Sequence, residues 1–245
     1  MNIKTFITYS ILVSGIISGI AFSQEPSSSR SAYTGVTNPI ISTNGAKFEP
    51  LPLQGVVAVE KNNVVSFVSE NARFQFTGDV IDKWSGKTLQ TLSDVSRAFN
   101  YADFSDIKFQ FDLLNPFVIG SGSKVVTMFV DPLCPHCERI FDELPRDSKQ
   151  YTFKLIPIGI LGKESIQAVK LLECAVDKNS ALQALLSKNY DYLKQVKSGC
   201  KSDLVTTRLI SSRLLGLNGV PYIIRHDGLI AKGYPPMGFM NWIEG

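Results

Sequence analysis

The first hydrophobic pattern in the chain is a series of short β-like runs between residues 55 and 78. Valine and phenylalanine dominate these runs, and asparagine-containing turn segments separate them. The predicted strands are residues 56–59, 64–68 and 74–77, with a shorter strand at 80–84. We expect a small antiparallel sheet, whose edges need to be covered or paired.

A short amphipathic helix is predicted directly after this sheet. Leu89, Leu92, Val95 and Phe99 recur at three- and four-residue steps, which places them on one face of a helix. Such a helix suits a connection between two domains, and the alternative is that it only covers the first sheet.

The second half of the chain alternates between strand-like and helix-like segments. Strands are predicted at residues 107–113, 124–130, 151–158, 222–225 and 229–232. Helices are predicted from the motif at residue 134 to about residue 144, over most of 163–215, and at 236–244. The run 124–130 is apolar almost throughout, as expected for a strand buried on both faces. This order predicts an α/β domain with a helical excursion.

The first residues have the pattern of an export signal. A short segment ending in Lys4 precedes an uncharged apolar run, and Ala21-Phe22-Ser23 offers small residues where a signal peptidase cleaves. An uncleaved anchor is the alternative, because about 20 apolar residues span a bilayer. Serine, threonine and glycine weaken the run, so we assign residues 1–23 to a signal peptide and 24–50 to a flexible leader. The mature protein is expected outside the cytoplasm.

Composition narrows the function classes. The chain has 245 residues and is 44% apolar, which is enough for one large or two small domains with ordinary cores. Its formal net charge of +3 is spread thinly, without a dense cluster of lysine and arginine. Nucleic acid is therefore not expected as a partner.

The cysteines carry the candidate chemistry. The chain has four of them, and an even number in an exported protein favours disulfides, whereas the same number in the cytosol would indicate zinc. Cys134-Pro135-His136-Cys137 follows the predicted buried strand and opens a helix. The helix N-terminus favours a thiolate at Cys134, Pro135 fits the first turn, and a charged His136 adds stabilisation. Two intervening residues bring Cys137 within bonding distance, so the motif predicts a reversible redox pair.

Other readings of the cysteines have less support. The motif is also compatible with an inert disulfide, or with half of a zinc site completed by Cys174 and Cys200. These two are widely separated rather than a second close pair, and export disfavours zinc. A cysteine hydrolase pairing Cys134 with His226 lacks a local signature. We therefore expect no metal and no cofactor.

Residues Phe129 to Cys137 (FVDPLCPHC), with Gly219-Val220-Pro221 downstream, resemble the thioredoxin-fold disulfide interchange proteins of the bacterial periplasm, and the DsbC/DsbG branch in particular. Shorter stretches between Gly55 and Asp82 resemble the small dimerisation domain of that branch. The resemblance implies a cystatin-like antiparallel β dimerisation domain, a linker helix, and an α/β thioredoxin-like domain with a helical insertion. The corresponding ranges are 51–86, 87–105 and 106–245, with the insertion at about 163–215.

The resemblance also implies roles for individual residues. Cys134 attacks a substrate disulfide and Cys137 resolves the mixed disulfide. Pro221 is the cis-proline facing them, and Val220 offers backbone hydrogen bonds to an extended substrate peptide. Asp131 is expected to be a loop carboxylate at the strand end, in preference to a proton-transfer group.

A second cysteine pair lies where the helical insertion of that branch carries one. The resemblance therefore implies a structural disulfide between Cys174 and Cys200, whose closure stabilises by roughly 3.5 kcal/mol in the chain-entropy model. Two free thiols in a helical core are the alternative.

The motif also departs from the branch. Pro135-His136 and Val220 stand where DsbC proteins have Gly-Tyr and threonine, and they resemble the DsbA oxidase. A periplasmic, homodimeric isomerase or general interchange enzyme is favoured, with a dithiol oxidase as the alternative. The expected partners are unfolded or mis-oxidised exported proteins and a membrane thiol reductant. A non-enzymatic chaperone, or an assembly factor for a secretion or conjugation apparatus, is the alternative from another class.

Overall fold

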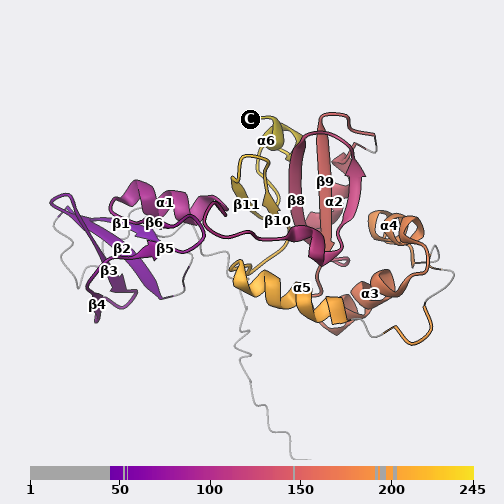
Figure 1. The fold of residues 1–245 in the computed structure, drawn as a ribbon, viewed down its shortest axis with the longest axis horizontal. Coiled ribbons are helices and arrows are strands. Elements are labelled where there is room, and N and C mark those ends of the chain that lie inside the picture. The colour runs from indigo at the N-terminus through magenta and orange to yellow at the C-terminus, as the bar shows by residue number, and fades with distance from the viewer. Residues whose placement is uncertain are drawn as a thin grey trace, which may run out of the picture. The chain divides into compact units, whose positions relative to one another are not determined.

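The computed structural model describes residues 45–51, 53, 55–145, 147–190, 193, 197–200 and 203–245 (Figure 1). The predicted signal peptide and the leader up to residue 44 lie outside the described residues. The end of the predicted leader is wrong, because residues 47–50 form a strand that pairs with the next one along the chain. Within the described ranges, no helix combines the length and the apolar character needed to cross a membrane.

The N-terminal part contains a four-stranded antiparallel sheet in chain order, covered on one face by a helix. Its strands are β1 (Lys47–Pro50), β2 (Val56–Lys61), β3 (Val64–Ser69) and β4 (Gln75–Phe76), and the helix is α1 (Leu92–Asn100). Val95 of α1 packs with Ala58 and Phe67 of the sheet. The predicted antiparallel strands and helix are therefore present, and dimerisation through them stays a prediction.

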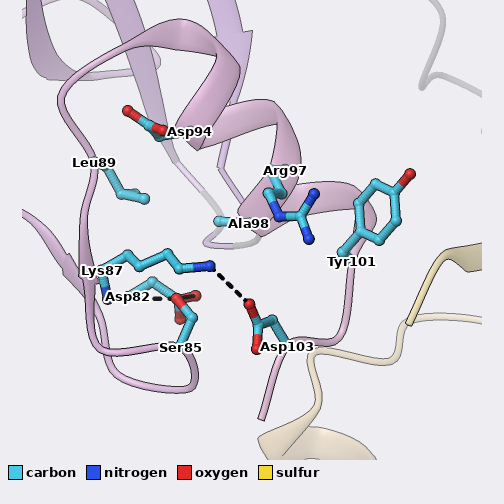
Figure 2. A pocket seen from close by; sticks show the side chains of 9 residues that line it. All are labelled: Asp82, Ser85, Lys87, Leu89, Asp94, Arg97, Ala98, Tyr101 and Asp103. Carbon is cyan, nitrogen blue, oxygen red and sulfur yellow. Dashed lines mark hydrogen bonds and ion pairs between the residues drawn. The ribbon is translucent and has the colours of Figure 1, made fainter. Parts of the chain in front are cut away.

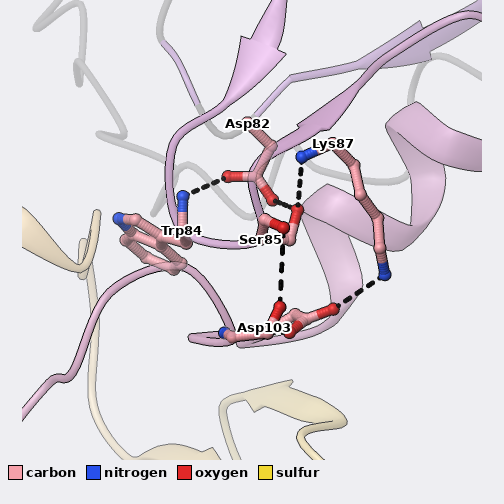
Figure 3. Close-up of polar contacts among 6 residues, drawn as sticks. Asp82, Trp84, Ser85, Lys87 and Asp103 are labelled. Carbon is pink, nitrogen blue, oxygen red and sulfur yellow. Dashed lines mark hydrogen bonds and ion pairs between the residues drawn. The ribbon is translucent and has the colours of Figure 1, made fainter.

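A short hairpin lies between β4 and α1 in the chain and contacts the segment after α1. It consists of β5 (Ile81–Asp82) and β6 (Lys87–Thr88). The Lys87 ammonium donates to the Asp103 carboxylate at 3.1 Å, and both residues line a pocket beside α1 (Figure 2). Within the hairpin, the Asp82 carboxylate accepts a hydrogen bond from the Trp84 amide at 3.0 Å (Figure 3). These contacts fix the course of the chain as it leaves α1.

The second half contains a five-stranded mixed sheet in the order β11-β10-β8-β9-β7. Its strands are β7 (Phe117–Gly120), β8 (Lys124–Val130), β9 (Tyr151–Pro157), β10 (Tyr222–Ile224) and β11 (Ile230–Lys232). Strands β8 and β9 are parallel and every other pair is antiparallel. Helix α2 (Pro135–Glu143) follows β8, and a helical excursion separates β9 from β10. This is the arrangement of a thioredoxin-like α/β fold, and that prediction is confirmed.

Two hydrophobic clusters cover the two faces of this sheet, which explains the uninterrupted apolar run of β8. On the first face, α2 and α6 (Phe239–Glu244) pack with α3 (Lys163–Cys174) and α4 (Lys178–Ser187). The second face is covered by aromatic residues of the segment before β7 and by Leu215, directly after α5 (Asp203–Leu214). Alternate residues of β8 point to opposite faces, with Met128 in one cluster and Phe129 in the other.

The predicted strand at 107–113 is wrong. Residues Phe111–Leu114 form a 3-10 helix, η1, and the edge strand is β7 instead. Phe109 lies 5.5 Å from Phe104 and 4.6 Å from Phe111 between ring centroids, and this cluster covers the second face of the sheet. The alternation of apolar residues there reflects aromatic packing rather than a hydrogen-bonded ladder.

The helical insertion is anchored by a buried arginine. Arg208 of α5 is 1% exposed, and its guanidinium bonds to the Glu173 carboxylate of α3 at 2.9 Å. It also donates to the carbonyl oxygens of Leu114 and Asn115, at 2.8 and 3.0 Å. One side chain thus joins α3, α5 and the turn before β7.

Candidate active site

The CPHC motif lies at the start of α2, at the end of the buried strand β8. Cys134 is the N-cap residue and Pro135 occupies the first turn, where its missing N–H removes no hydrogen bond. Cys134 and Cys137 are both free thiols and both buried, at 4% and 0% exposure, whereas Pro135 and His136 are exposed. The helix N-terminus places backbone donors and the positive end of the dipole next to Cys134.

The two thiols have opposite acidities. A hydrogen bond from the Cys137 thiol, together with the amides of Cys137 and His136 and the His136 side chain, lowers the pKa of Cys134 to about 6. Donation to Cys134 raises the pKa of Cys137 far above its ordinary range, and burial raises it further. At neutral pH, Cys134 is therefore mostly thiolate, whereas Cys137 remains a thiol.

The segment before β10 faces the motif. The Val220–Pro221 peptide bond is cis, and the Cys134 sulfur lies 3.6 Å from the Val220 carbonyl oxygen, to which it donates when it is protonated. Val220 also packs against the hydrophobic cluster that contains both thiols. The structure thus brings together the six residues that the sequence singled out for the redox site and its substrate-binding segment.

Asp131 is not the simple loop carboxylate that was expected. It is completely buried, three residues before Cys134, and accepts four hydrogen bonds. Its charge contributes to the raised pKa of Cys137. The sequence placed Asp131 near the motif, but three of its four partners come from distant positions and were missed.

The remaining cysteines lie elsewhere and are bonded to each other. Cys174, the last residue of α3, forms a disulfide with Cys200, with their Cα atoms 5.8 Å apart. The four cysteines therefore do not converge on one zinc site.

The hydrolase pairing with His226 is also contradicted. His226 packs on Tyr151, which pairs with Lys124 at the far end of β8 from Cys134. The length of the strand separates the two side chains, so they do not form a catalytic pair.

The acidity of Cys134 predicts a pH profile. Alkylation of Cys134 by iodoacetamide is expected to show a midpoint near pH 6, where the thiolate forms. At pH 7 it should be several-fold faster than for an ordinary thiol, because the larger thiolate fraction outweighs the lower intrinsic nucleophilicity. Stopped-flow measurement of the thiolate absorbance gives the same midpoint independently.

Replacement of Cys137 provides the matched control for this profile. Cys137→Ala removes the donor to Cys134 and should raise the midpoint, whereas the serine hydroxyl of Cys137→Ser can still donate. A wild-type midpoint near pH 9, or equal shifts in both variants, would contradict this account.

The fold is thioredoxin-like, and the site places two buried free cysteines at the start of one helix. No family model matches the chain. Among curated proteins, it is similar to the thiol:disulfide interchange protein DsbC of Dickeya dadantii, with 22% identity over 212 residues. That similarity covers 83% of this chain and 82% of DsbC, and it supports the general class of thiol–disulfide oxidoreductases.

Three solved structures illustrate the similarity of the fold. A disulfide interchange protein from Neisseria gonorrhoeae is 23% identical, with 54% of this chain and 95% of that chain covered and a TM-score of 0.44. ScsC of Proteus mirabilis is 21% identical, with coverages of 49% and 66% and a TM-score of 0.40. The exchange protein α-DsbA2 of Wolbachia pipientis is 19% identical, with coverages of 55% and 86% and a TM-score of 0.40.

Proposed function

We propose that the protein is a periplasmic thiol:disulfide interchange enzyme that rearranges disulfides in unfolded or mis-oxidised exported proteins. The observation that carries the proposal is the pairing of two buried thiols of opposite acidity at one helix start. Cys134, with a pKa of about 6, supplies the nucleophile, and Cys137 keeps its proton until a mixed disulfide forms.

The proposed reaction begins with the dithiol form. The Cys134 thiolate attacks one sulfur of a substrate disulfide, forming a mixed disulfide and releasing the other substrate sulfur as a thiolate. A third substrate cysteine then attacks the mixed disulfide, forming a new substrate disulfide and releasing Cys134 as the thiolate, so the substrate is isomerised without net oxidation. If Cys137 loses its proton and attacks instead, the substrate leaves reduced and Cys134–Cys137 becomes a disulfide. A membrane thiol reductant then regenerates the dithiol with two electrons.

Isomerase or general interchange is favoured over oxidase by the extent of the similarity to DsbC. The matched length of 212 residues exceeds the segment 106–245, so the similarity extends into the N-terminal part as well. A homodimer joined through the N-terminal sheets is part of this proposal. The motivation is the exposed edge strand β4, with Phe74 and Phe76 both about half exposed. Sedimentation showing only monomer at micromolar concentration would contradict the dimer.

A dithiol oxidase is the second candidate, and the acidity of Cys134 supports it. A stabilised thiolate stabilises the reduced form, which makes the Cys134–Cys137 disulfide more oxidising. The discriminating measurement is the redox potential of the pair, obtained by equilibration with glutathione buffers. The oxidase would be identified by a strongly oxidising potential, together with conversion of the Cys134–Cys137 disulfide mainly to the dithiol when it is mixed with unfolded proteins that carry free thiols.

Refolding of a protein with scrambled disulfides tests the enzyme proposal against a chaperone or assembly factor. The wild type should accelerate recovery of the native pairing in a buffer that keeps Cys134 reduced. Cys134→Ala should not, because the mixed disulfide cannot form. Equal assistance by both proteins would mean that the protein acts as a non-enzymatic binding factor.

A further inference from the structure

The Asp131 carboxylate accepts hydrogen bonds from three parts of the chain. Its Oδ1 accepts from the Leu133 amide at 2.9 Å and from the Ser165 hydroxyl of α3 at 2.8 Å. Its Oδ2 accepts from the amides of Ile160 and Leu161, at 2.9 and 3.1 Å. The active-site loop, the loop after β9 and the first turn of α3 therefore share one buried acceptor.

The loop of residues 158–162 has a local sequence that permits this arrangement. The Ile158 amide continues the sheet by donating to the Val130 carbonyl oxygen at 2.8 Å. A Cβ atom at Gly159 would lie 2.7 Å from the Ile166 Cα, so only glycine allows α3 to approach this closely. Gly162 has a φ of 135°, a conformation that favours glycine, and leads directly into α3. The loop is therefore fixed at its start by the sheet, in its middle by Asp131, and at its end by α3.

Although their backbones are fixed by Asp131, this loop and the residue before Cys134 expose aliphatic side chains. Leu133, Ile160 and Leu161 are 40%, 37% and 54% exposed, and their amides converge on the same carboxylate. We refer to these three side chains as the aliphatic rim. Leu133 immediately precedes Cys134, so this member of the rim adjoins any substrate that is bonded to Cys134.

We propose that Asp131 is a positioning residue that fastens the loop of residues 158–162 to the redox motif, so that the aliphatic rim recognises apolar residues flanking the substrate cysteine. The inference rests on the proposed function, because it concerns which disulfides Cys134 attacks. Asp131 itself stays behind the motif and does not contact the substrate.

The chemistry of unfolded proteins explains why an aliphatic rim is useful. Cysteine is among the most frequently buried residues, so the residues around it in a native protein commonly belong to the core. An unfolded or mis-oxidised chain exposes these apolar neighbours, whereas a correctly folded protein hides them. A rigid aliphatic surface beside Cys134 therefore favours extended, misfolded substrates over native disulfides.

The same carboxylate affects the thiols electrostatically. Its charge acts with burial and the hydrogen bond to Cys134 to raise the pKa of Cys137. Replacement of Asp131 alone would therefore combine effects on the rim with effects on Cys137. Ser165 and the exposed rim residues allow the two contributions to be separated.

The test compares two disulfide peptides of equal length in the full-length protein, one with leucine and valine next to its cysteines and one with serine and glycine. In the wild type, kcat/KM should be higher for the apolar peptide. In the double variant Ile160→Ser/Leu161→Ser, the ratio between the two peptides should fall about tenfold, because the apolar contacts are lost. Leu214→Ser, which removes an even more exposed aliphatic side chain (69%) on α5, should keep the wild-type ratio.

Ser165→Ala tests the positioning role, because it removes one of the donors that tie α3 to Asp131. We expect a higher KM for the apolar peptide with kcat retained, whereas a general loss of folded protein would lower kcat for both peptides equally. An unchanged peptide ratio in the double variant, or an equal loss in Leu214→Ser, would overturn the inference. If the wild type exchanged neither peptide nor oxidised glutathione, the proposed function itself would fail.

Discussion

Cys134→Ser is expected to reduce thiol exchange to the uncatalysed background, a loss of about a thousandfold or more. A serine hydroxyl does not ionise near neutral pH, whereas the Cys134 pKa of about 6 makes the wild-type residue mostly thiolate. The measurement is the rate of reduction of a fluorescent disulfide peptide with excess reductant. Circular dichroism should show an unchanged fold, because the substitution replaces one small buried side chain by another.

Cys137→Ser provides the informative contrast. The nucleophile remains, so a mixed disulfide with substrate should form, but Cys137 is no longer present to resolve it. Mass spectrometry of the alkylated protein should then show substrate bonded to Cys134. Accumulation of adduct on Cys137 in Cys134→Ser, at a rate similar to that of Cys134 in Cys137→Ser, would contradict the assignment of the nucleophile.

The elements around the redox motif could be predicted because their signals are local. The apolar run at 124–130 corresponds to β8, and the proline after Cys134 marks the start of α2. The segment 107–113 was misassigned for the opposite reason. Phe109 and Phe111 are apolar because they pack on the sheet as an aromatic cluster, and single-sequence alternation does not distinguish this from a strand.

The site shows the same division between local and long-range information. The position of the two motif cysteines on one helix turn follows from their spacing, but the approach of Val220 to Cys134 depends on the folded sheet. Asp131 was expected to be an ordinary loop carboxylate because its partners Ile160, Leu161 and Ser165 lie 29 to 34 positions away. The local sequence signals of this arrangement were Gly159 and Gly162. Their role can be explained only from the structure, where α3 packs against the loop that contains them.

The helical insertion that carries Ser165 depends on a second buried charge, which the hydrophobic pattern also did not reveal. Arg208 lies among apolar residues of α5, and burial lowers the pKa of its guanidinium while Glu173 opposes that shift. One of its nitrogens, Nη1, is buried without a hydrogen-bond partner among the described residues. The cost of burying this cation is offset by the hydrogen bonds of its other nitrogens with α3 and with the turn at 114–115.

Arg208→Met should therefore destabilise the protein by about 3–5 kcal/mol, because it leaves the Glu173 carboxylate and two carbonyl oxygens without their donor. The measurement is the free energy of unfolding from urea denaturation, with Arg213→Ala on the exposed side of α5 as control, expected to change it by less than about 0.5 kcal/mol. The double variant Arg208→Met/Glu173→Met should recover part of the loss, since it removes the unpaired charge as well. A loss below about 1 kcal/mol in Arg208→Met would mean that solvent replaces these contacts.

In the destabilised variant, α3 should loosen before the sheet does, so preference for apolar-flanked peptides should decline at denaturant concentrations where Cys134 still reacts.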